Sequence, residues 1–366
     1  MHRCTWHICA LARADLIYSM TILLNIRMKH LLHRQPSVAG DVCKGLALRL
    51  ATPGAVGRNL ATKSASSDKM VFSTSFTSIA NARDLAETAY GIQPGKVCRS
   101  GNPSSATLED CARLRKDFGI RHFVDLRSRE EHALDKGWHD VMSNGTILTY
   151  SFQSHGIQVE EEVIPEGGLG ASHCKMHRIS LLEKKRFIRK LLWRLPVLKT
   201  LVALGFRILG YEAKMKEILL PEVNALGLPL VYEVILETAK NEIKSCLDRI
   251  LDAQRKGEPV LIFCKLGKDR TGLLCALVLA CCDVPLESIL DDYSLSNNLD
   301  EIALGGIEKM EDVQGVDKSL FSSAPREAMA QTFKYIDSKY GSVHEYLDSI
   351  DFSYHLQKEL KNLLIH

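Results

Sequence analysis

Short, wholly apolar runs are the plainest feature of the hydrophobic pattern, and they predict strands. The run Pro259–Phe263 has the length of a buried strand, and it leads through a tight loop into a longer apolar segment that ends near Val284. This longer segment predicts a helix. Two segments that also contain polar residues, His122–Val124 and Thr146–Phe152, predict two more strands, and the second of them follows a turn at Ser143–Gly145.

Longer amphipathic segments predict the other helices. One is expected over Ala106–Phe118, and Pro229–Gln254 is interpreted as a single long helix. Three segments nearer the C-terminus have the ordinary pattern of helices packed on a protein surface. They are Leu286–Asn297, Ala324–Ser338 and Tyr354–Leu364.

The loop between the apolar strand and the apolar helix holds the candidate chemistry. It contains Cys264 and Arg270, six positions apart, with Gly267 and Gly272 where the backbone must turn tightly. A loop that leads into a helix directs free backbone N–H groups toward one point, and the helix dipole adds partial positive charge there. A cysteine facing such an anion site is expected to be held as a thiolate. A thiolate beside an anion site and a fixed guanidinium is equipped to attack phosphorus.

The spacing Cys-x5-Arg alone is a weak pattern, because chance matches are common. Its context makes it informative: the apolar strand before it, the two glycines, Thr271 after the arginine, and the apolar helix behind. A sulfurtransferase loop of the rhodanese type follows a different pattern. A nucleotide-binding loop would need G-x4-G-K-[S/T], which is absent.

Composition narrows the class of protein. The 366 residues are 46% hydrophobic and 25% charged, as in a soluble globular protein, and leave room for one large domain or two small ones. The eleven cysteines are scattered and include no C-x2-C pair, so we predict neither a zinc site nor a disulfide framework. A reducing compartment is therefore expected, and a catalytic thiol would need one.

The net charge of +3 hides an asymmetry between the ends of the chain. Residues 1–70 contain ten Lys and Arg against three acidic residues, while the remainder has 37 basic and 41 acidic residues. The slightly acidic body gives no indication of nucleic-acid binding. The leader over 1–70 has the composition of a transit peptide to a mitochondrion or plastid, or of a disordered tail, or of a gene start set too early before Met70. In the last two cases a cytoplasmic protein is expected.

Several motifs in order resemble an atypical tyrosine/lipid phosphatase family of bacteria, fungi and plants. The resemblance extends from about Ser78 to Leu364, and the ordered set is far more specific than any one motif. It implies an α/β phosphatase fold over 71–366, with a central, mostly parallel sheet flanked by helices. The motifs are Asn81-Ala-Arg83-Asp84-Leu85, Arg99-Ser100, Asp125-Leu-Arg127-Ser128-Arg-Glu-Glu131, Cys264-Lys-Leu-Gly-Lys-Asp-Arg-Thr-Gly272, Asp292-Tyr-Ser-Leu-Ser-Asn297 and Gly341-Ser-Val-His-Glu-Tyr346-Leu347.

A helical insertion is expected over about 166–228, because the minimal fold does not require these residues and family members have helical lids in this region. Leu181–Leu195 places its apolar residues on one broad face, and Pro196 ends that helix. Val197–Leu209 is a second apolar segment, too short to span a bilayer. One interpretation is a basic amphipathic lid, 181–209, that contacts an anionic membrane peripherally. The other is a helical pair with its apolar face on the domain and its basic face in water.

The loop residues are assigned roles in phosphoryl transfer. Cys264 is the predicted nucleophile and forms a phosphocysteine that water hydrolyses. Arg270 holds two phosphate oxygens, and the backbone amides of Lys265–Arg270 bind the remaining charge, so no metal or other cofactor is needed. Thr271 can donate a hydrogen bond to the sulfur. The phosphate-binding residues of the loop are predicted to be Lys265, Leu266, Gly267, Lys268 and Gly272.

The general acid is predicted to be Asp269, within the loop itself. Many tyrosine phosphatases carry an aspartate about thirty residues before the cysteine, but here that window contains only Glu233 and Glu237, inside a predicted helix. The family resemblance also implies Asp269. Its alternative role is structural, as an acceptor of amide hydrogen bonds. Four residues outside the loop are assigned to its support, namely Asp125, Arg127, Arg83 and Asp84.

Two lysines bear on the substrate. Lys265 and Lys268 occupy the positions of the paired lysines in the loop C-K-A-G-K-G-R of the tumour-suppressor phosphoinositide 3-phosphatase. Lys268 is shared with relatives that take phosphotyrosine, so only Lys265 is distinguishing. The enzyme is therefore predicted to hydrolyse phosphotyrosine and, as a hypothesis, phosphoinositides, with a phosphorylated protein or inositol lipid as its partner.

One departure from the family pattern favours an alternative function. The family usually has histidine before the cysteine, where it buttresses the loop, and this chain has Phe263. A catalytically weak or inactive phosphatase that binds phosphate or acts as a scaffold is therefore the rival hypothesis. The presence of Cys264, Asp269, Arg270 and Thr271 argues against it.

Overall fold

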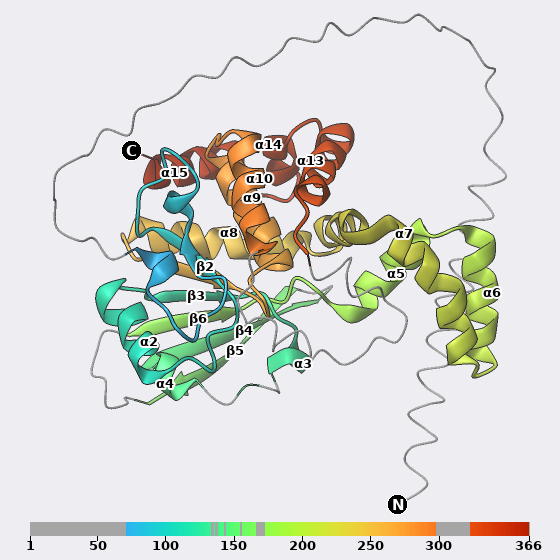
Figure 1. Cartoon of the computed structure of the whole chain (residues 1–366), viewed down its shortest axis with the longest axis horizontal. Helices are drawn as coiled ribbons and strands as arrows, with labels where there is room; N and C mark the ends of the chain where they lie inside the picture. The colour runs from blue at the N-terminus through green and yellow to red at the C-terminus, as the bar shows by residue number, and fades with distance from the viewer. Residues whose placement is uncertain are drawn as a thin grey trace, which may run out of the picture. The chain divides into compact units, whose positions relative to one another are not determined.

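A computed structural model of the chain describes residues 71–132, 135, 138–142, 144–153, 156–165, 173–297 and 323–365. The predicted leader over 1–70 lies outside these residues. Within the described residues, helices and strands are interleaved along the chain (Figure 1).

Seven strands of the described chain form one sheet in the order β1-β2-β7-β3-β6-β4-β5. The five inner strands are parallel, and the short β1 and the long β5 add to the edges in antiparallel fashion. The predicted α/β fold with a mostly parallel sheet is therefore confirmed. The strands are β1 Arg83–Asp84, β2 Val97–Ser100, β3 His122–Asp125, β4 Gly145–Gln153, β5 Gly156–Ile164, β6 Cys174–Arg178 and β7 Val260–Phe263.

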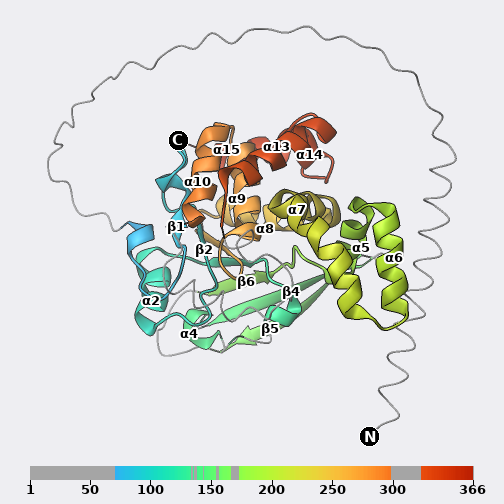
Figure 2. The same ribbon diagram turned by 45° about the vertical axis from the view of Figure 1, so that its right-hand side comes forward.

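The sheet separates two hydrophobic clusters, and the residues of β7 alternate between them. Val260 and Ile262 belong to the larger cluster, which also takes in the apolar residues of α8 and α9. Leu261 and Phe263 belong to the smaller one, with apolar residues of α2 and α4. Figure 2 shows the corresponding layers, with α8 and α9 on one side of the sheet and α2 and α4 on the other. This two-sided burial explains why β7 is apolar at every position.

The remaining helices lie close to their predicted positions. The segment predicted over Ala106–Phe118 is a short α-helix that continues into a π-helical turn at Arg113–Asp117. The apolar helix behind the loop begins at Asp269 and ends at Cys281. The bounds are α2 Leu108–Ala112, α3 Arg129–His132, α4 His139–Met142, α9 Asp269–Cys281, α10 Leu286–Ser294, α13 Arg326–Tyr340, α14 Val343–Asp348 and α15 Tyr354–Leu364.

The prediction of one long helix over Pro229–Gln254 is wrong. The chain forms two helices, α7 (Glu212–Thr238) and α8 (Lys240–Arg255), with Ala239 between them in a non-helical conformation. Arg186 donates a hydrogen bond of 3.0 Å to the carbonyl of Thr238, which occupies an acceptor that the break in the helix leaves without its usual partner. Because this partner comes from a distant segment, the local sequence does not show the break.

The helical insertion predicted over about 166–228 needs a correction at its start. Cys174–Arg178 is strand β6, which lies between β3 and β4 inside the sheet, so the fold does require it. The helices begin later, with α5 at Lys184–Arg194 and α6 at Val197–Ile208, separated by Pro196 as predicted. The first part of α7 follows them.

Helix α7 consists of two parts that meet at Gly227. This residue has φ 56° and ψ −153°, a conformation that favours glycine and breaks the helical path. By length and composition α7 is apolar enough to cross a membrane. Its second part, however, contributes Leu228, Tyr232 and Leu236 to the larger hydrophobic cluster. That part is a core helix of the domain.

The basic side chains of α5 divide between water, which one of the two interpretations expected for all of them, and the domain: Lys184, Lys185 and Arg189 are exposed, whereas three others have acidic partners. Arg186 pairs with Glu242 of α8, and Lys190 and Arg194 pair with Glu237 of α7. These acidic partners attract one side of α5 toward the domain. Large apolar side chains of α6 are instead left in water, and Leu198 is 75% exposed.

Candidate active site

The loop after β7 brings the predicted catalytic residues together. Cys264 follows the last residue of the strand and is only 3% exposed, and α9 begins at Asp269. In the described part of the chain, the backbone N–H groups of Lys265, Leu266 and Gly267 donate to no other residue. Together with the N-terminus of α9, these donors could bind an anion.

The two glycines of the loop motif are required for different structural reasons. Gly267 has φ +67°, and a Cβ atom there would collide with the carbonyl group of Ser100 and lie 2.6 Å from the nitrogen of Gly101. Only glycine lets the loop approach β2 so closely. Gly272 lies inside α9, where a Cβ atom would lie 2.9 Å from the ring of Tyr293. Its role is close packing.

The guanidinium of Arg270 is held by Glu131, a residue that the sequence analysis quoted but assigned no role. Two hydrogen bonds of 2.6 and 2.8 Å join its terminal nitrogens to the two carboxylate oxygens. Burial acts to lower the pKa of Arg270, but the hydrogen bond to Glu131 and the negative charge of Cys264 outweigh it and raise the pKa. For Glu131, burial opposes ionisation, yet the bonds from Arg270 lower its pKa to about 2. The sequence did contain a signal for this role. Glu131 lies four positions after Arg127, just beyond the end of a strand that neighbours β7.

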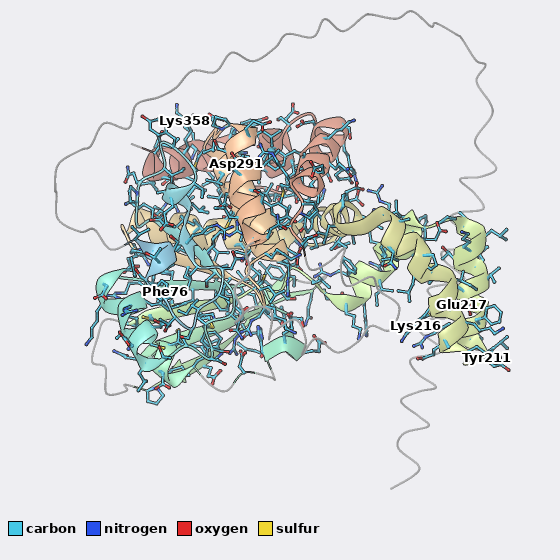
Figure 3. The ribbon with its side chains drawn as sticks, in the orientation of Figure 1. Phe76, Tyr211, Lys216, Glu217, Asp291 and Lys358 are labelled. Carbon is cyan, nitrogen blue, oxygen red and sulfur yellow. The ribbon has the colours of Figure 1, made fainter. Side chains whose placement is uncertain are left out.

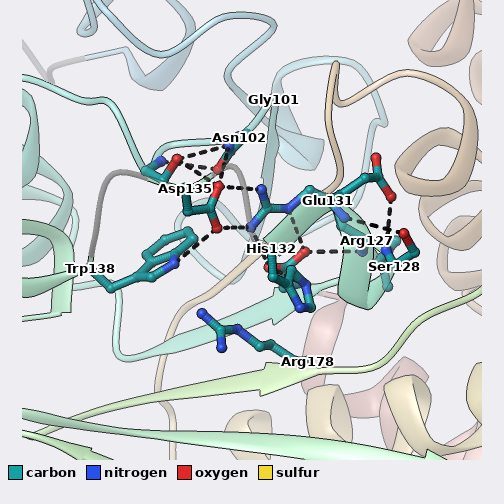
Figure 4. Close-up of polar contacts among 12 residues, drawn as sticks. Gly101, Asn102, Arg127, Ser128, Glu131, His132, Asp135, Trp138 and Arg178 are labelled. Carbon is teal, nitrogen blue, oxygen red and sulfur yellow. Dashed lines mark hydrogen bonds and ion pairs between the residues drawn. The ribbon is translucent and has the colours of Figure 1, made fainter. Parts of the chain in front are cut away.

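Asp125 and Arg127 lie at the end of β3, which pairs directly with β7. Arg127 donates to Asp125 at 2.9 and 2.7 Å and to Asp135 at 2.7 and 2.8 Å, and Trp138 donates to the same Asp135 (Figure 4). Burial favours the protonated form of Asp125, but bonds from His132 and the charge of Arg127 hold its pKa well below the usual range. Asp125 is therefore a fixed anion that orients Arg127.

Phe263 is completely buried beneath this cluster. The guanidinium of Arg127 lies 5.4 Å from the centre of its ring, and the indole of Trp138 lies 5.7 Å away, centre to centre. Both distances are within the range of cation–π and aromatic contacts. Phe263 belongs to the smaller hydrophobic cluster, whereas Cys264 belongs to the larger one, so the two side chains lie on opposite faces of the sheet.

The opposite side of the loop is tied down by two buried arginines that share one aspartate. Arg83 donates to Asp292 at 2.9 Å, and Arg99 donates to the same carboxylate and, at 2.8 Å, to the carbonyl of Gly267. Burial and the charge of Arg99 lower the pKa of Arg83 to about 10, which still leaves it a cation at neutral pH. Asn81 adds a bond of 3.0 Å to the carbonyl of Leu266.

These contacts assign Arg83 to support of the loop and leave Asp84 with a different task. The carboxylate of Asp84 accepts from the backbone of Ala86 at 3.0 Å and of Gly95 at 2.5 Å, so it stabilises the chain that leads into β2. Arg99 and Asp292 have direct structural roles that the sequence analysis did not assign. Their positions in two of the ordered motifs were the available signal.

Within the described residues, the carboxylate of Asp269 is bonded through one of its two oxygens, Oδ1. Its Oδ1 accepts a hydrogen bond of 2.7 Å from Tyr232 and lies 3.0 Å from the ammonium of Lys268, and Tyr293 hydrogen bonds to Tyr232 at 2.7 Å. Burial raises the pKa of Tyr232, and the charge of Asp269 adds to the effect, so the phenol retains its proton and donates. The side chain of Asp269 is about one third exposed, with 32% of its surface in water.

The two loop lysines lie in different surroundings. Lys268 is completely buried, and its ammonium also donates to the carbonyl of Ser323 at 2.8 Å. Lys265 is half-buried, and within the described residues its ammonium has no hydrogen-bond or ion-pair partner. The hydroxyl of Thr271 is buried and likewise has no partner among the residues described. The described chain contains no cluster of three or more His, Cys, Asp or Glu side chains that could hold a metal ion.

Comparison with known proteins agrees with this site. Residues 74–366 match the sequence model of the tyrosine phosphatase family. A curated relative, the triple specificity protein phosphatase PtpB of Mycobacterium tuberculosis, is 28% identical over 219 residues, which is 60% of this chain and 67% of the relative. The predicted resemblance to a tyrosine phosphatase family is thus confirmed.

Proposed function

Because the chain belongs to the tyrosine phosphatase family, a family of phosphoric monoester hydrolases, we propose that it hydrolyses phosphotyrosine and phosphoinositides through a phosphocysteine at Cys264. The observation that carries the proposal is the geometry of the loop. One short loop at the N-terminus of a buried helix carries a buried thiol, backbone N–H groups without an acceptor among the described residues, and the guanidinium of Arg270, which interacts electrostatically with Cys264. This is the arrangement that a phosphoryl group with three charged oxygens requires.

The reaction follows from two displacements at phosphorus. The thiolate of Cys264 forms an S–P bond while the bond from phosphorus to the leaving oxygen breaks, and Asp269 gives that oxygen its proton. Water then forms a new P–O bond and gives a proton back to Asp269, while the S–P bond breaks and the thiolate returns. The contacts of Asp269 suit this role, because Tyr232 and Lys268 hold Oδ1 and leave Oδ2 for the proton.

Thr271 completes the second step. Its buried hydroxyl has no partner among the described residues, so it can donate to the sulfur of Cys264 without first breaking another bond. A hydrogen bond to sulfur stabilises the thiolate as it leaves. The Thr271 hydroxyl is thus a hydrogen-bond donor that no described residue uses.

Lys265 is the loop cation that supports phosphoinositides as substrates. It is half-buried at the edge of the loop, and its ammonium has no partner in the described part of the chain, so it can meet a second phosphate. Lys268 does not contribute in this way, because its ammonium is buried between Asp269 and Ser323. The name of the curated relative, a triple specificity phosphatase, agrees with acceptance of more than one substrate class.

A direct assay tests the proposal against the rival hypothesis of a weak or inactive phosphate-binding protein. The purified chain is incubated with a phosphotyrosine peptide and, separately, with phosphoinositide in anionic vesicles, and phosphate release is measured with Cys264→Ser as the control. We expect release from both substrates, lost in the variant. Binding without release would favour the rival, and release from the peptide alone would restrict the function to phosphotyrosine.

The proposal includes peripheral contact with an anionic membrane, through a different face from the one the sequence indicated. Three basic side chains of α5 have acidic partners, whereas Leu198 of α6 and Leu209 directly after it are at least 70% exposed. Tyr211 lies at the far end of the pair of helices α6 and α7, beside Lys216 and Glu217 and away from the sheet (Figure 3). An exposed apolar face with an aromatic residue and lysines at its tip is typical of interfacial helices.

Sedimentation with anionic vesicles tests this contact. The double substitution Leu198→Glu and Leu209→Glu should abolish binding to the vesicles, because it places two charges in the apolar face. Leu286→Glu on α10, also at an exposed apolar position, serves as the control and should leave binding intact. Equal binding by all three proteins would rule out this face as the contact.

A further inference from the structure

A cavity of about 470 Å³ lies between α5 and the end of α7, outside the loop that carries Cys264. Its size is within the range of small-ligand pockets. Arg186, Arg189, Lys190 and Trp193 line it from α5, and Glu237 and Thr238 line it from α7. The four residues of α5 occupy positions i, i+3, i+4 and i+7, so one face of the helix forms the wall.

The lining is strongly unbalanced in charge, with three cations and one carboxylate. That carboxylate, Glu237, is shared, because Lys190, Arg194 and Lys339 all pair with it and Tyr335 donates to it. Burial opposes its ionisation, but these bonds lower its pKa to about 2, so it is a permanent anion that is already saturated. It cannot neutralise a further cation of the cavity.

The positive charge left for a ligand comes from Arg189 and, in part, from Lys190. Arg186 directs its guanidinium to Glu242 and to the carbonyl of Thr238. Arg189 is exposed and has no ion-pair partner within the described chain. An arginine fork with an adjacent ammonium suits the oxygens of a phosphate group. A phosphomonoester carries a charge of about −1.5 to −2 at neutral pH, so it would pair with Arg189 and share Lys190 with Glu237.

We propose that this cavity is a second anion site, which binds a phosphomonoester group without hydrolysing it. Arg189 forms the two-point contact, Lys190 adds the ammonium, and the indole of Trp193 gives the ring of the bound molecule an apolar wall. None of the six lining residues is a nucleophile with the anion cradle of the catalytic loop, so the site holds the group and does not react with it. The proposal is independent of the reaction at Cys264.

Binding is measured on the full chain carrying Arg270→Ala, which removes the guanidinium of the catalytic loop and isolates the second site. The probe is free inositol bisphosphate, followed by calorimetry and by the fluorescence of Trp193. We expect one site to remain in this background. Arg189→Glu should weaken it roughly tenfold or more, because the two-point contact becomes repulsive. Trp193→Phe should remove the fluorescence change.

The matched control is Lys184→Glu, which makes the same change of charge on the same helix at an exposed residue outside the cavity. Lys184 lies five positions before Arg189, so it is not one of its i,i+3 or i,i+4 neighbours on the helix, and the substitution should weaken binding by no more than about twofold. Equal weakening by the two substitutions, or loss of all binding on Arg270→Ala alone, would overturn the proposal.

A second arm identifies the source of the phosphate group. Vesicles of phosphatidylcholine with and without phosphatidylinositol phosphate are sedimented with the same proteins. Retention that depends on the phosphorylated lipid and on Arg189 identifies a lipid headgroup. Binding of the free headgroup without such retention identifies a soluble phosphate ester.

Discussion

Arg270 and Glu131 meet in a two-point ion pair, although 139 positions separate them in the chain. Glu131 belongs to α3, which follows β3, and Arg270 belongs to the first turn of α9, which follows the neighbouring β7. The pair therefore connects the carboxyl ends of two adjacent parallel strands. It sets the direction of the guanidinium before any substrate arrives, so little ordering remains to be done on binding.

Glu131→Gln should lower kcat/KM about 10- to 100-fold, because a neutral amide cannot fix both nitrogens of Arg270. Glu130→Gln, at the adjacent position, is the control and should change kcat/KM less than about threefold. Steady-state kinetics with a phosphotyrosine peptide measures both. Equal effects of the two substitutions would show that Glu131 does not position the arginine.

Asp269→Asn should separate substrates by their leaving groups. An aryl phosphate with a poor leaving group needs the proton and should lose about 100- to 10,000-fold in kcat, whereas one with a good leaving group should lose much less. The two substrates are compared on the same preparation, so misfolding would affect both alike. Equal losses would remove Asp269 from the role of general acid.

Tyr232→Phe should lower kcat more for an aryl phosphate with a poor leaving group than for one with a good leaving group. The phenol donates to Oδ1 of Asp269 and so fixes the carboxyl group that gives the leaving oxygen its proton. Tyr293→Phe is the control, because Tyr293 bonds to Tyr232 and has no bond to Asp269 in the described structure. Steady-state kinetics with the two substrates measures the difference, and equal losses on both would contradict the assignment.

Gly267→Ala should cost about 2–4 kcal/mol of unfolding free energy and most of the activity, because the new methyl group collides with the carbonyl of Ser100. Gly95→Ala is a matched control: its φ is also positive, at +76°, but its surroundings are open. It should cost only the strain of the backbone, about 1–2 kcal/mol. Denaturant unfolding compares them, and equal costs would mean that the close approach to β2 is unimportant.

Asp292→Asn should destabilise the fold by about 3–5 kcal/mol, because it leaves Arg83 and Arg99 buried without their shared anion. Asp291→Asn, next to it but exposed and paired with Arg326, should cost about 0–1 kcal/mol. Thermal unfolding of the two variants gives the comparison. A similar cost for both would argue that the buried cluster contributes little.

The same cluster predicts the direction of acid sensitivity. Burial opposes the ionisation of Asp292, but Arg99 and Arg83 lower its pKa in the folded state. The stabilising contribution is therefore complete above the unfolded value of about 4 and is lost as the pH falls below it. Asp292→Asn should flatten that part of the curve of stability against pH.

The sequence predicted the features that depend on local pattern. The run that became β7 is apolar because this parallel strand is buried at every position, as β3 is, and the loop motif identified the nucleophile's surroundings. Strand β6 was missed because its sequence, Cys174–Arg178, is half polar, and β5 because most of its residues lie in water. The break at Ala239 depends on Arg186, fifty-three positions earlier in the chain.

The supporting residues could be predicted only in part. Arg83, Asp125 and Arg127 lie next to strand ends, where a parallel sheet places polar side chains, and the structure gives each a contact in the clusters around the loop. Glu131, Arg99 and Asp292 act over separations of 139 to 193 positions. Their pairing is a property of the folded chain, and motif order shows only that such residues are present.

The alternation of side chains in β7 changes the meaning of the phenylalanine before the nucleophile. Phe263 lies in the layer of Trp138 and Arg127, on the face of the sheet opposite to Cys264. Residue 263 therefore fills space in the smaller hydrophobic cluster. The surroundings of residue 264 are set by residues of the larger cluster. The two adjacent positions are therefore under separate packing constraints, and a substitution at residue 263 leaves the cluster around Cys264 unchanged.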